Sequence, residues 1–198
     1  MTYPVQREVP TNGGDSGSIP QARKPATLPL KDKQTVSSEG ELIASCIAGV
    51  VIHRRPLQED ERGELMEIYN PAWGIHPAPM VYAYFVAIRP GRVKGWVVHR
   101  LQDDRLFFIG GVTRVALFDD RPGSPTYRML SVFVLSERNR GLLIIPRGVF
   151  HALKNIGSND SVFLNLPTRP YDHADPDKYR LPVKNDLIPF AFEDSGSG

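Results

Sequence analysis

The chain has 198 residues, of which 41% are hydrophobic and 23% are charged, and this length fits one domain. Its 24 basic and 22 acidic side chains nearly cancel, which leaves a formal net charge of +2. This balance argues against a nucleic-acid-binding or membrane-surface protein, which would carry a clustered basic excess. The single cysteine, Cys46, excludes an intramolecular disulfide and suits a reducing compartment. Because no apolar run approaches the roughly 18–20 residues of a membrane span, and none begins the chain, we expect a cytoplasmic protein.

Residues 1–40 lack clustered apolar side chains. The segment contains five prolines, four glycines and four serines. Such a composition cannot bury enough apolar surface to offset the entropy lost on ordering, so we predict a disordered N-terminal tail. An extended arm that docks on a partner subunit is the alternative. Residues 193–198 are expected to form a C-terminal tail.

From Leu42 onward, short apolar runs alternate with turn residues such as Pro90-Gly91 and Gly110-Gly111. Runs rich in Val, Ile and Phe with regular turn signals are typical of antiparallel strands. No stretch keeps a helical stripe of apolar residues over three turns. The runs are 42–52, 64–70, 80–88, 92–99, 105–109, 112–119, 128–136, 141–146, 149–153 and 161–166.

The run 80–88 is apolar on both faces, which predicts a strand covered on both sides, in a two-sheet sandwich or under a dimer partner. Nine or ten such strands fit an all-β sandwich or jelly roll. We therefore predict a jelly-roll domain over residues 41–192. The polar, proline-rich segment 167–190 is expected to wrap around the barrel surface.

The most specific motif is the segment 146–155, PRGVFHALKN. Its Pro-x-Gly-x-x-His-x-x-x-Asn spacing resembles the second conserved motif of the cupins, a superfamily of jelly-roll (double-stranded β-helix) barrels. Pro146 and Gly148 would make a tight turn into a strand, and His151 would point into the barrel. Four segments in the same order look like the dTDP-4-dehydrorhamnose 3,5-epimerase family of cupins: 60–63, 90–95, 119–126 and 146–151.

The resemblance implies a homodimer that acts as an epimerase or isomerase on a dTDP-linked 4-keto-6-deoxy sugar, with no metal and no other cofactor. The reaction removes a proton from a carbon next to the ketone and returns one from the other face. It needs a base on one side of the sugar and an acid on the other. It also needs a cation near the enolate oxygen and arginines that hold the diphosphate.

The general base is expected to be His99. A gapless match to the family places Val97 at the position of the family's histidine. Because side chains alternate along a strand, residues 97 and 99 share a face, so His99 can still point into the cavity. By the same resemblance, Lys94 takes the place of a family arginine and Arg105 lies near a family lysine. Both are candidates to polarise the ketone.

The family's acid is a tyrosine, and that position aligns with Asn165. Tyr171 is the nearest phenol downstream and is therefore the candidate acid, while Asn165 becomes a substrate-binding candidate. The family's aspartate that orients the histidine is sought at Asp172 or Asp175.

Three further residues are expected to bind the nucleotide sugar. Arg62 matches the arginine of an Asp-x-Arg-Gly motif and is the expected diphosphate contact. His151 matches the motif histidine that lines the pocket. Trp96 is a candidate surface for the thymine, with packing in the core or at a dimer interface as the alternative.

Two alternatives to the enzyme remain open. The changed residues Val97 and Asn165 are compatible with a non-catalytic cupin that binds a nucleotide sugar or another small molecule. A metal-dependent cupin oxygenase would take ligands from His99, His151 and either Asp103 or Asp104. Since the His-x-His and Glu of the first cupin motif are incomplete here, and stable sites usually need three protein ligands or more, we expect no metal.

Overall fold

The computed structural model describes residues 34, 38 and 47–192. The chain divides into two units, Met1–Gln34 and Thr35–Gly198, and all described residues except Gln34 belong to the second. Apart from positions 34 and 38, the predicted N-terminal tail over 1–40 lies outside the described residues. The predicted tail over 193–198 lies outside them as well. Among the described residues, no helix has the length and apolar character needed to cross a membrane.

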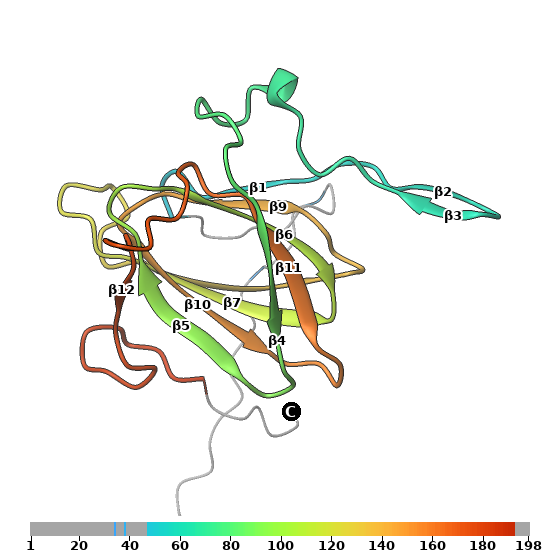
Figure 1. Ribbon diagram of the computed structural model, residues 1–198. Helices are drawn as coiled ribbons and strands as arrows, with labels where there is room; N and C mark the ends of the chain where they lie inside the picture. The colour runs from blue at the N-terminus through green and yellow to red at the C-terminus, as the bar shows by residue number, and fades with distance from the viewer. Residues whose placement is uncertain (1–33, 35–37, 39–46, 193–198) are drawn as a thin grey trace, which may run out of the picture. The chain divides into compact units, whose positions relative to one another are not determined.

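Short antiparallel strands and one 3-10 helix, η1 (Pro71–Trp73), form the described part of the second unit (Figure 1). Strands β4 to β11 coincide with the apolar runs that predicted them, whereas the run 64–70 is a strand only at its start. The strands are β1 (Val51–His53), β2 (Gln58–Asp60), β3 (Gly63–Leu65), β4 (Tyr84–Ile88), β5 (Val93–Val98), β6 (Asp104–Gly110), β7 (Val112–Asp119), β8 (Leu130–Ser136), β9 (Leu142–Ile145), β10 (Val149–Asn155), β11 (Ser161–Asn165) and β12 (Tyr179–Arg180).

Two five-stranded sheets are built from these strands. The first has the order β1-β9-β6-β11-β4, and the second has the order β12-β5-β10-β7-β8. β2 and β3 form a separate two-stranded hairpin. In the first sheet Asn165 pairs with Tyr84, and in the second His151 pairs with Val97. The predicted all-β jelly-roll fold is confirmed.

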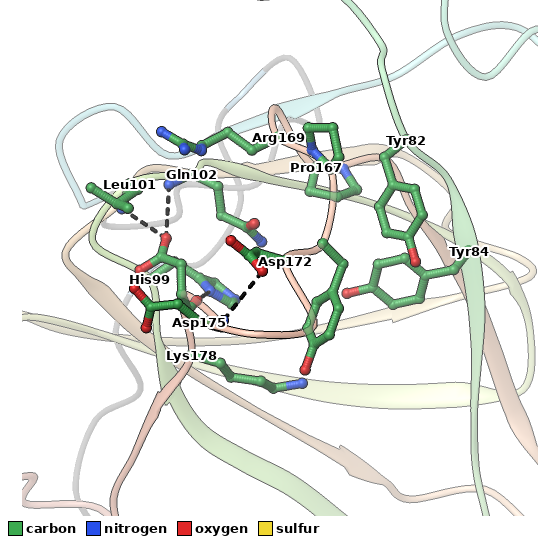
Figure 2. A pocket seen from close by; sticks show the side chains of 13 residues that line it. Tyr82, Tyr84, His99, Leu101, Gln102, Pro167, Arg169, Asp172, Asp175 and Lys178 are labelled. Atoms are coloured by element: carbon green, nitrogen blue, oxygen red, sulfur yellow. Dashed lines mark hydrogen bonds between the residues drawn. The ribbon is translucent and has the colours of Figure 1, made fainter.

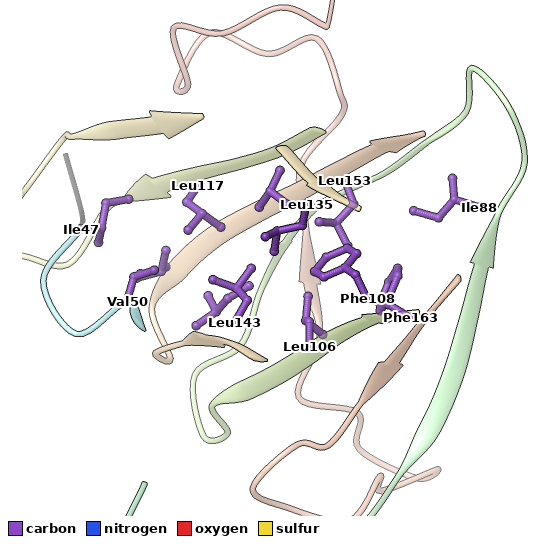
Figure 3. Packing of buried hydrophobic residues seen from close by; sticks show 13 residues of the cluster. Ile47, Val50, Ile88, Leu106, Phe108, Leu117, Leu135, Leu143, Leu153 and Phe163 are labelled. Carbon is purple, nitrogen blue, oxygen red and sulfur yellow. The ribbon is translucent and has the colours of Figure 1, made fainter. Parts of the chain in front are cut away.

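The main core contains side chains from both sheets (Figure 3). Leu106 and Phe108 lie on one face of β6, and Val149 and Leu153 lie on one face of β10. All four are at most 4% exposed. Alternation at period two places such residues on one face of each strand. Burying each aliphatic or aromatic side chain of this kind contributes about 1.5–3 kcal/mol, which holds the sheets face to face.

β4 lies at an edge of the first sheet, and only one of its faces is covered. Ile88 is 1% exposed, whereas Phe85 on the other face is 71% exposed. The prediction of a strand covered on both sides is therefore met on one face only within this single chain.

Gly95 allows β5 to approach β10 closely. A Cβ atom at this position would lie 2.5 Å from the Cα atom of Ala152, and the φ angle of Gly95 is +140°. Both observations exclude a larger side chain without a backbone shift. The close approach brings the strand that leads to His99 next to the strand that carries His151.

The motif at 119–126 is a turn that closes on the buried carboxylate of Asp119. Arg121 Nε donates to Asp119 at 2.7 Å, and the hydroxyls of Ser124 and Thr126 donate to it at 2.6 Å each. Arg121 also donates to the carbonyl of Ala48 at 2.7 Å. This part of the family resemblance is therefore a structural element.

The C-terminal segment is attached to the second sheet beside β5. Tyr179 of β12 pairs with Val98 of β5. The carboxylate of Asp177 accepts hydrogen bonds from the backbone N–H groups of residues 100, 101 and 102, at 2.9, 2.7 and 3.0 Å. The segment predicted to wrap around the barrel thus also reaches the surroundings of His99.

Candidate active site

His99 and Asp104 form a buried pair at the crossing from β5 to β6. The Nε2 atom of His99 lies 3.2 Å from Oδ2 of Asp104, and the two residues are 8% and 3% exposed. The other carboxylate oxygen of Asp104 accepts a hydrogen bond of 3.0 Å from the amide of Gln102. The carboxylate is therefore held on both sides and faces the imidazole.

The second ring nitrogen of His99, Nδ1, is hydrogen-bonded to the backbone carbonyl of Asp177. A carbonyl oxygen only accepts, so Nδ1 carries a proton and Nε2 is the nitrogen presented to Asp104. Burial acts to lower the pKa of His99, but the hydrogen bond and charge of Asp104 outweigh it and raise that pKa above its ordinary value. Burial acts to raise the pKa of Asp104, yet the two histidines hold it at about 2.

His151 lies beside this pair. Its ring stacks on His99 with centroids 5.5 Å apart, and its Nε2 atom is 3.5 Å from Oδ2 of Asp104. Burial lowers the pKa of His151 to about 4, against the opposing charge of Asp104. At neutral pH the two imidazoles therefore differ, since His99 is the one that holds a proton more readily.

Two adjoining cavities open onto these residues. The first, of about 230 Å³, is named here the histidine cavity. The second, of about 130 Å³, is named the tyrosine cavity (Figure 2). Tyr84, His99 and Lys178 line both. The polar lining of the histidine cavity consists of Tyr84, Lys94, His99, Asp104, His151, Asn165, Lys178 and Arg180. The polar lining of the tyrosine cavity consists of Tyr82, Tyr84, His99, Gln102, Arg169, Tyr171, Asp172, Asp175, Asp177 and Lys178.

Three cations surround the histidine cavity: Lys94 on β5, Lys178, and Arg180 on β12. Burial lowers the pKa of Lys178, and the positive charges of Arg180 and Lys94 lower it further. In the described part of the chain, none of the three makes an ion pair. Like charges held together in this way favour an anionic ligand, because its charge would relieve their repulsion.

Arg105 was predicted to polarise the ketone, but the structure places it away from the cavities. Its guanidinium is fully buried and donates to the backbone carbonyls of Leu166, Ala78, Pro79 and Pro167, at 2.6, 2.9, 2.9 and 3.3 Å. It lines neither cavity. Since neighbouring residues of a strand point to opposite faces, Asp104 points into the cavity and Arg105 points away from it.

Arg62 and Trp96 also lie outside both cavities. Arg62 is in the turn of the β2–β3 hairpin, where it pairs with Asp60 at 2.5 Å and is largely exposed. Trp96 is fully buried and packs with Phe118 and Ile188 in a separate apolar cluster. The structure thus gives Trp96 its alternative role in core packing.

Asn165 and Tyr171 do line the site. The amide of Asn165, on β11, donates a hydrogen bond of 2.9 Å to the hydroxyl of Tyr84. Tyr171 is 42% exposed and borders the tyrosine cavity, where its ring meets that of His173 at 4.9 Å. Asp172 and Asp175 border the same cavity, but the carboxylate that contacts His99 is that of Asp104.

His99, Asp104 and His151 are also the described residues able to hold a metal ion. One ligand atom from each lies within 4.8 Å of the others, and all three residues are buried. Two imidazoles and a carboxylate suit several divalent transition metals. The candidate oxygenase ligands of the sequence therefore do come together, with Asp104 rather than Asp103 as the carboxylate. Asp103 instead pairs with His76 at 3.1 Å.

Several site residues have no sequence motif. The pairing of β4 with β11 brings Tyr84 to the site, and the irregular C-terminal segment brings Lys178 and Arg180 there. The available signal for Tyr84 was its strand, since Tyr84, Val86 and Ile88 share the inward face of β4.

The family described as dTDP-4-dehydrorhamnose 3,5-epimerase matches residues 44–184 of the chain. The chain is 34% identical to the probable low-salt glycan biosynthesis epimerase Agl13 of Haloferax volcanii, over 69% of this chain and 88% of that protein. It is 35% identical to the spore coat polysaccharide biosynthesis protein SpsL of Bacillus subtilis, over 51% of this chain and 67% of that protein.

Solved structures share the fold. A dTDP sugar isomerase from Desulfovibrio desulfuricans G20 superposes with a TM-score of 0.70 at 24% identity, covering 76% of this chain and 94% of that one. ChmJ, a 3'-monoepimerase from Streptomyces bikiniensis in complex with dTDP-quinovose, superposes with a TM-score of 0.66 at 18% identity, covering 75% and 77%.

Proposed function

Because the chain belongs to the dTDP-4-dehydrorhamnose 3,5-epimerase family, we propose that it epimerises a dTDP-linked 4-keto-6-deoxy sugar by removing a proton next to the ketone. The observation that carries this proposal is the 3.2 Å contact between His99 Nε2 and Asp104 Oδ2 at the cavity wall. An imidazole paired with a buried carboxylate is a suitable general base, since the carboxylate stabilises the imidazolium that forms.

The proton chemistry assigned to His99 follows from its two ring nitrogens. The protonated ring donates from Nε2 to Asp104. The neutral ring has no hydrogen to donate there, so Nε2 becomes free to accept a proton from a substrate carbon in the histidine cavity. The proton taken from the substrate carbon turns His99 into an imidazolium, and the negative charge of Asp104, 3.2 Å from Nε2, stabilises it, which favours the abstraction step.

The cations of the histidine cavity supply the charge that the substrate needs. We assign the diphosphate to Lys178 and Arg180, which line the cavity next to the catalytic pair. Lys94 lines the same cavity and keeps its expected role of polarising the ketone as the enolate forms. Arg105 has no part in this assignment, because its guanidinium is occupied by backbone carbonyls.

Isotope exchange tests the proposal. The chain is incubated with a dTDP-4-keto-6-deoxyhexose in D₂O, and the sugar is then examined by NMR. We expect deuterium at a carbon next to the ketone and a new diastereomer. If the dTDP-sugar stabilises the protein against heat yet acquires no deuterium, the non-catalytic nucleotide-sugar-binding cupin is the correct function.

A metal-dependent cupin is the second candidate, and the convergence of His99, Asp104 and His151 within 4.8 Å favours it. Metal analysis of the purified protein and activity after dialysis against a chelator separate the two candidates. Full epimerase activity in metal-free protein would show that the three residues act in proton transfer without a metal. Loss of activity that added Mn²⁺, Fe²⁺ or Ni²⁺ restores would assign them to a metal.

We further propose that the chain acts as a cytoplasmic homodimer. The exposed face of β4 presents Phe85, and the preceding residues Met80 and Val81 are 50% and 48% exposed. An uncovered apolar edge strand is a ready pairing surface, and two-fold dimers are the commonest oligomers. Sedimentation at micromolar concentration tests the dimer, and a Phe85→Glu variant should shift the equilibrium toward monomer.

A further inference from the structure

The proposed reaction needs an acid, and the position that aligns with the family's tyrosine acid is Asn165. An amide cannot give a proton to a carbanion, so another residue must be the acid. The structure offers a phenol in the adjacent strand. Tyr84 of β4 pairs in register with Asn165 of β11, and the Asn165 amide donates to the Tyr84 hydroxyl at 2.9 Å. Tyr84 thus supplies, next to position 165, the hydroxyl that Asn165 lacks.

We propose that Tyr84 is the proton donor that completes the epimerisation, with Asn165 as its positioning residue. This inference rests on the proposed function. His99 takes the proton from the carbon next to the ketone, which leaves an enolate. Tyr84 then gives its hydroxyl proton to the same carbon from the other face. To reset the site, the imidazolium releases one proton to solvent and the Tyr84 phenolate takes one up.

The direction of the hydrogen bond leaves the Tyr84 proton available. The amide nitrogen of Asn165 is the donor and the hydroxyl oxygen of Tyr84 is the acceptor. Asp104 supports this orientation of the amide, because a hydrogen bond from the Asn165 amide also lowers the pKa of the Asp104 carboxyl. Since Asn165 uses a lone pair of the hydroxyl, the O–H bond of Tyr84 remains free to point at a ligand.

Tyr84 and His99 reach the cavities from different sheets. Tyr84 lies on β4 of the first sheet, and His99 directly follows β5 of the second. Figure 2 shows the two side chains on opposite sides of the tyrosine cavity, with the hydroxyl of Tyr84 directed toward its middle. Both residues also line the histidine cavity, so a sugar ring bound where the two cavities meet would have a base on one face and an acid on the other, as inversion of a carbon centre requires.

The protonation state of Tyr84 agrees with this role. Burial raises the pKa of Tyr84 to about 12, and the negative charge of Asp104 acts in the same direction. The phenol therefore keeps its proton at neutral pH until a carbanion is present to take it. Tyr171, the phenol expected from the sequence, is more exposed and lines only the tyrosine cavity.

The test compares Tyr84→Phe with Tyr171→Phe and with Tyr127→Phe, an exposed tyrosine outside both cavities, as the control. Each variant is incubated with a dTDP-4-keto-6-deoxyhexose in D₂O. We expect Tyr84→Phe to exchange deuterium into the sugar with retention of configuration, while inversion falls by roughly 10²-fold or more. Tyr127→Phe should invert the sugar at nearly the wild-type rate, and Tyr171→Phe should retain inversion far above that of Tyr84→Phe.

The inference is overturned if Tyr84→Phe inverts the sugar as fast as the wild-type protein, or if only Tyr171→Phe loses inversion. Failure of the proposed function is a different result, in which the wild-type protein neither exchanges nor inverts the sugar. An Asn165→Leu variant tests the positioning role. It should lower kcat with little change in KM, whereas a general loss of structure would lower the thermal unfolding temperature and raise KM.

Discussion

The carboxylate of Asp104 lies 3.2 Å from the Nε2 atom of His99, although the two residues belong to opposite sides of the jelly roll. Asp104 begins β6 in the first sheet, and His99 follows β5 in the second. The pair is therefore formed by the loop that crosses between the sheets. Its geometry depends on the fold as a whole, and it fixes the imidazole at the boundary of both cavities.

Replacing His99 should abolish proton abstraction. In a His99→Gln variant we expect deuterium exchange and inversion to fall together by roughly 10²–10⁴-fold, the range typical of a general base. The exchange is measured by NMR in D₂O. His173→Gln serves as the control, since His173 is an exposed residue on the irregular C-terminal segment. Exchange at the wild-type rate in His99→Gln would assign the base to another group.

The activity should rise with pH. His99 acts as a base only when neutral, and Asp104 raises its pKa above the ordinary value of 6.5. The profile of kcat/KM should therefore climb as pH passes through a midpoint above 6.5. In Asp104→Asn the charge is gone while burial remains, so the midpoint should move down. A midpoint that stays in place would show that the titrating group is not the His99–Asp104 pair.

Lys178 and Arg180 should bind the diphosphate. Removing one charge–phosphate contact costs about 1.5–3 kcal/mol, so Lys178→Ala and Arg180→Ala should each weaken dTDP binding by roughly 10–100-fold. Isothermal titration with dTDP and with thymidine separates phosphate binding from base binding, because thymidine affinity should not change. Lys184→Ala, outside both cavities, is the control. Equal dTDP affinity in all variants would remove the assignment.

Arg105 should be required for stability rather than for chemistry. Its buried guanidinium serves four backbone carbonyls, and each buried acceptor left without a partner costs about 1–3 kcal/mol. We expect Arg105→Met to lower the free energy of unfolding by at least about 3 kcal/mol, as measured by urea denaturation. Arg105→Lys should also destabilise the protein, since an ammonium cannot reach all four carbonyls. A stable but inactive Arg105→Lys protein would instead indicate a catalytic role.

The fold was predictable because strand period and turn residues are local signals. The runs 112–119 and 149–153 coincide with β7 and with most of β10. His151 was predictable for a similar reason, as its spacing from Pro146 and Gly148 defines a turn and a strand. Each of these features depends on residues that are close together in the sequence.

The remaining site residues depend on contacts between distant parts of the chain. Tyr84 and Asn165 are 81 positions apart and meet only once the register of β4 and β11 is known. Asp177 is 78 positions from His99, in a segment with almost no regular structure. The error over Arg105 has a simpler cause, since strand alternation allows only one of Asp104 and Arg105 to face the cavity.

The turn at 119–126 closes on Asp119, and the hydrogen bonds to that carboxylate join residues of the turn to one another rather than to the site histidines, so its role is in folding. A chain without any proton-transferring group could therefore still fold with this turn. The turn indicates the fold and does not by itself indicate the activity. Inspection of positions 84, 99, 104 and 165 would be the way to recognise an active chain.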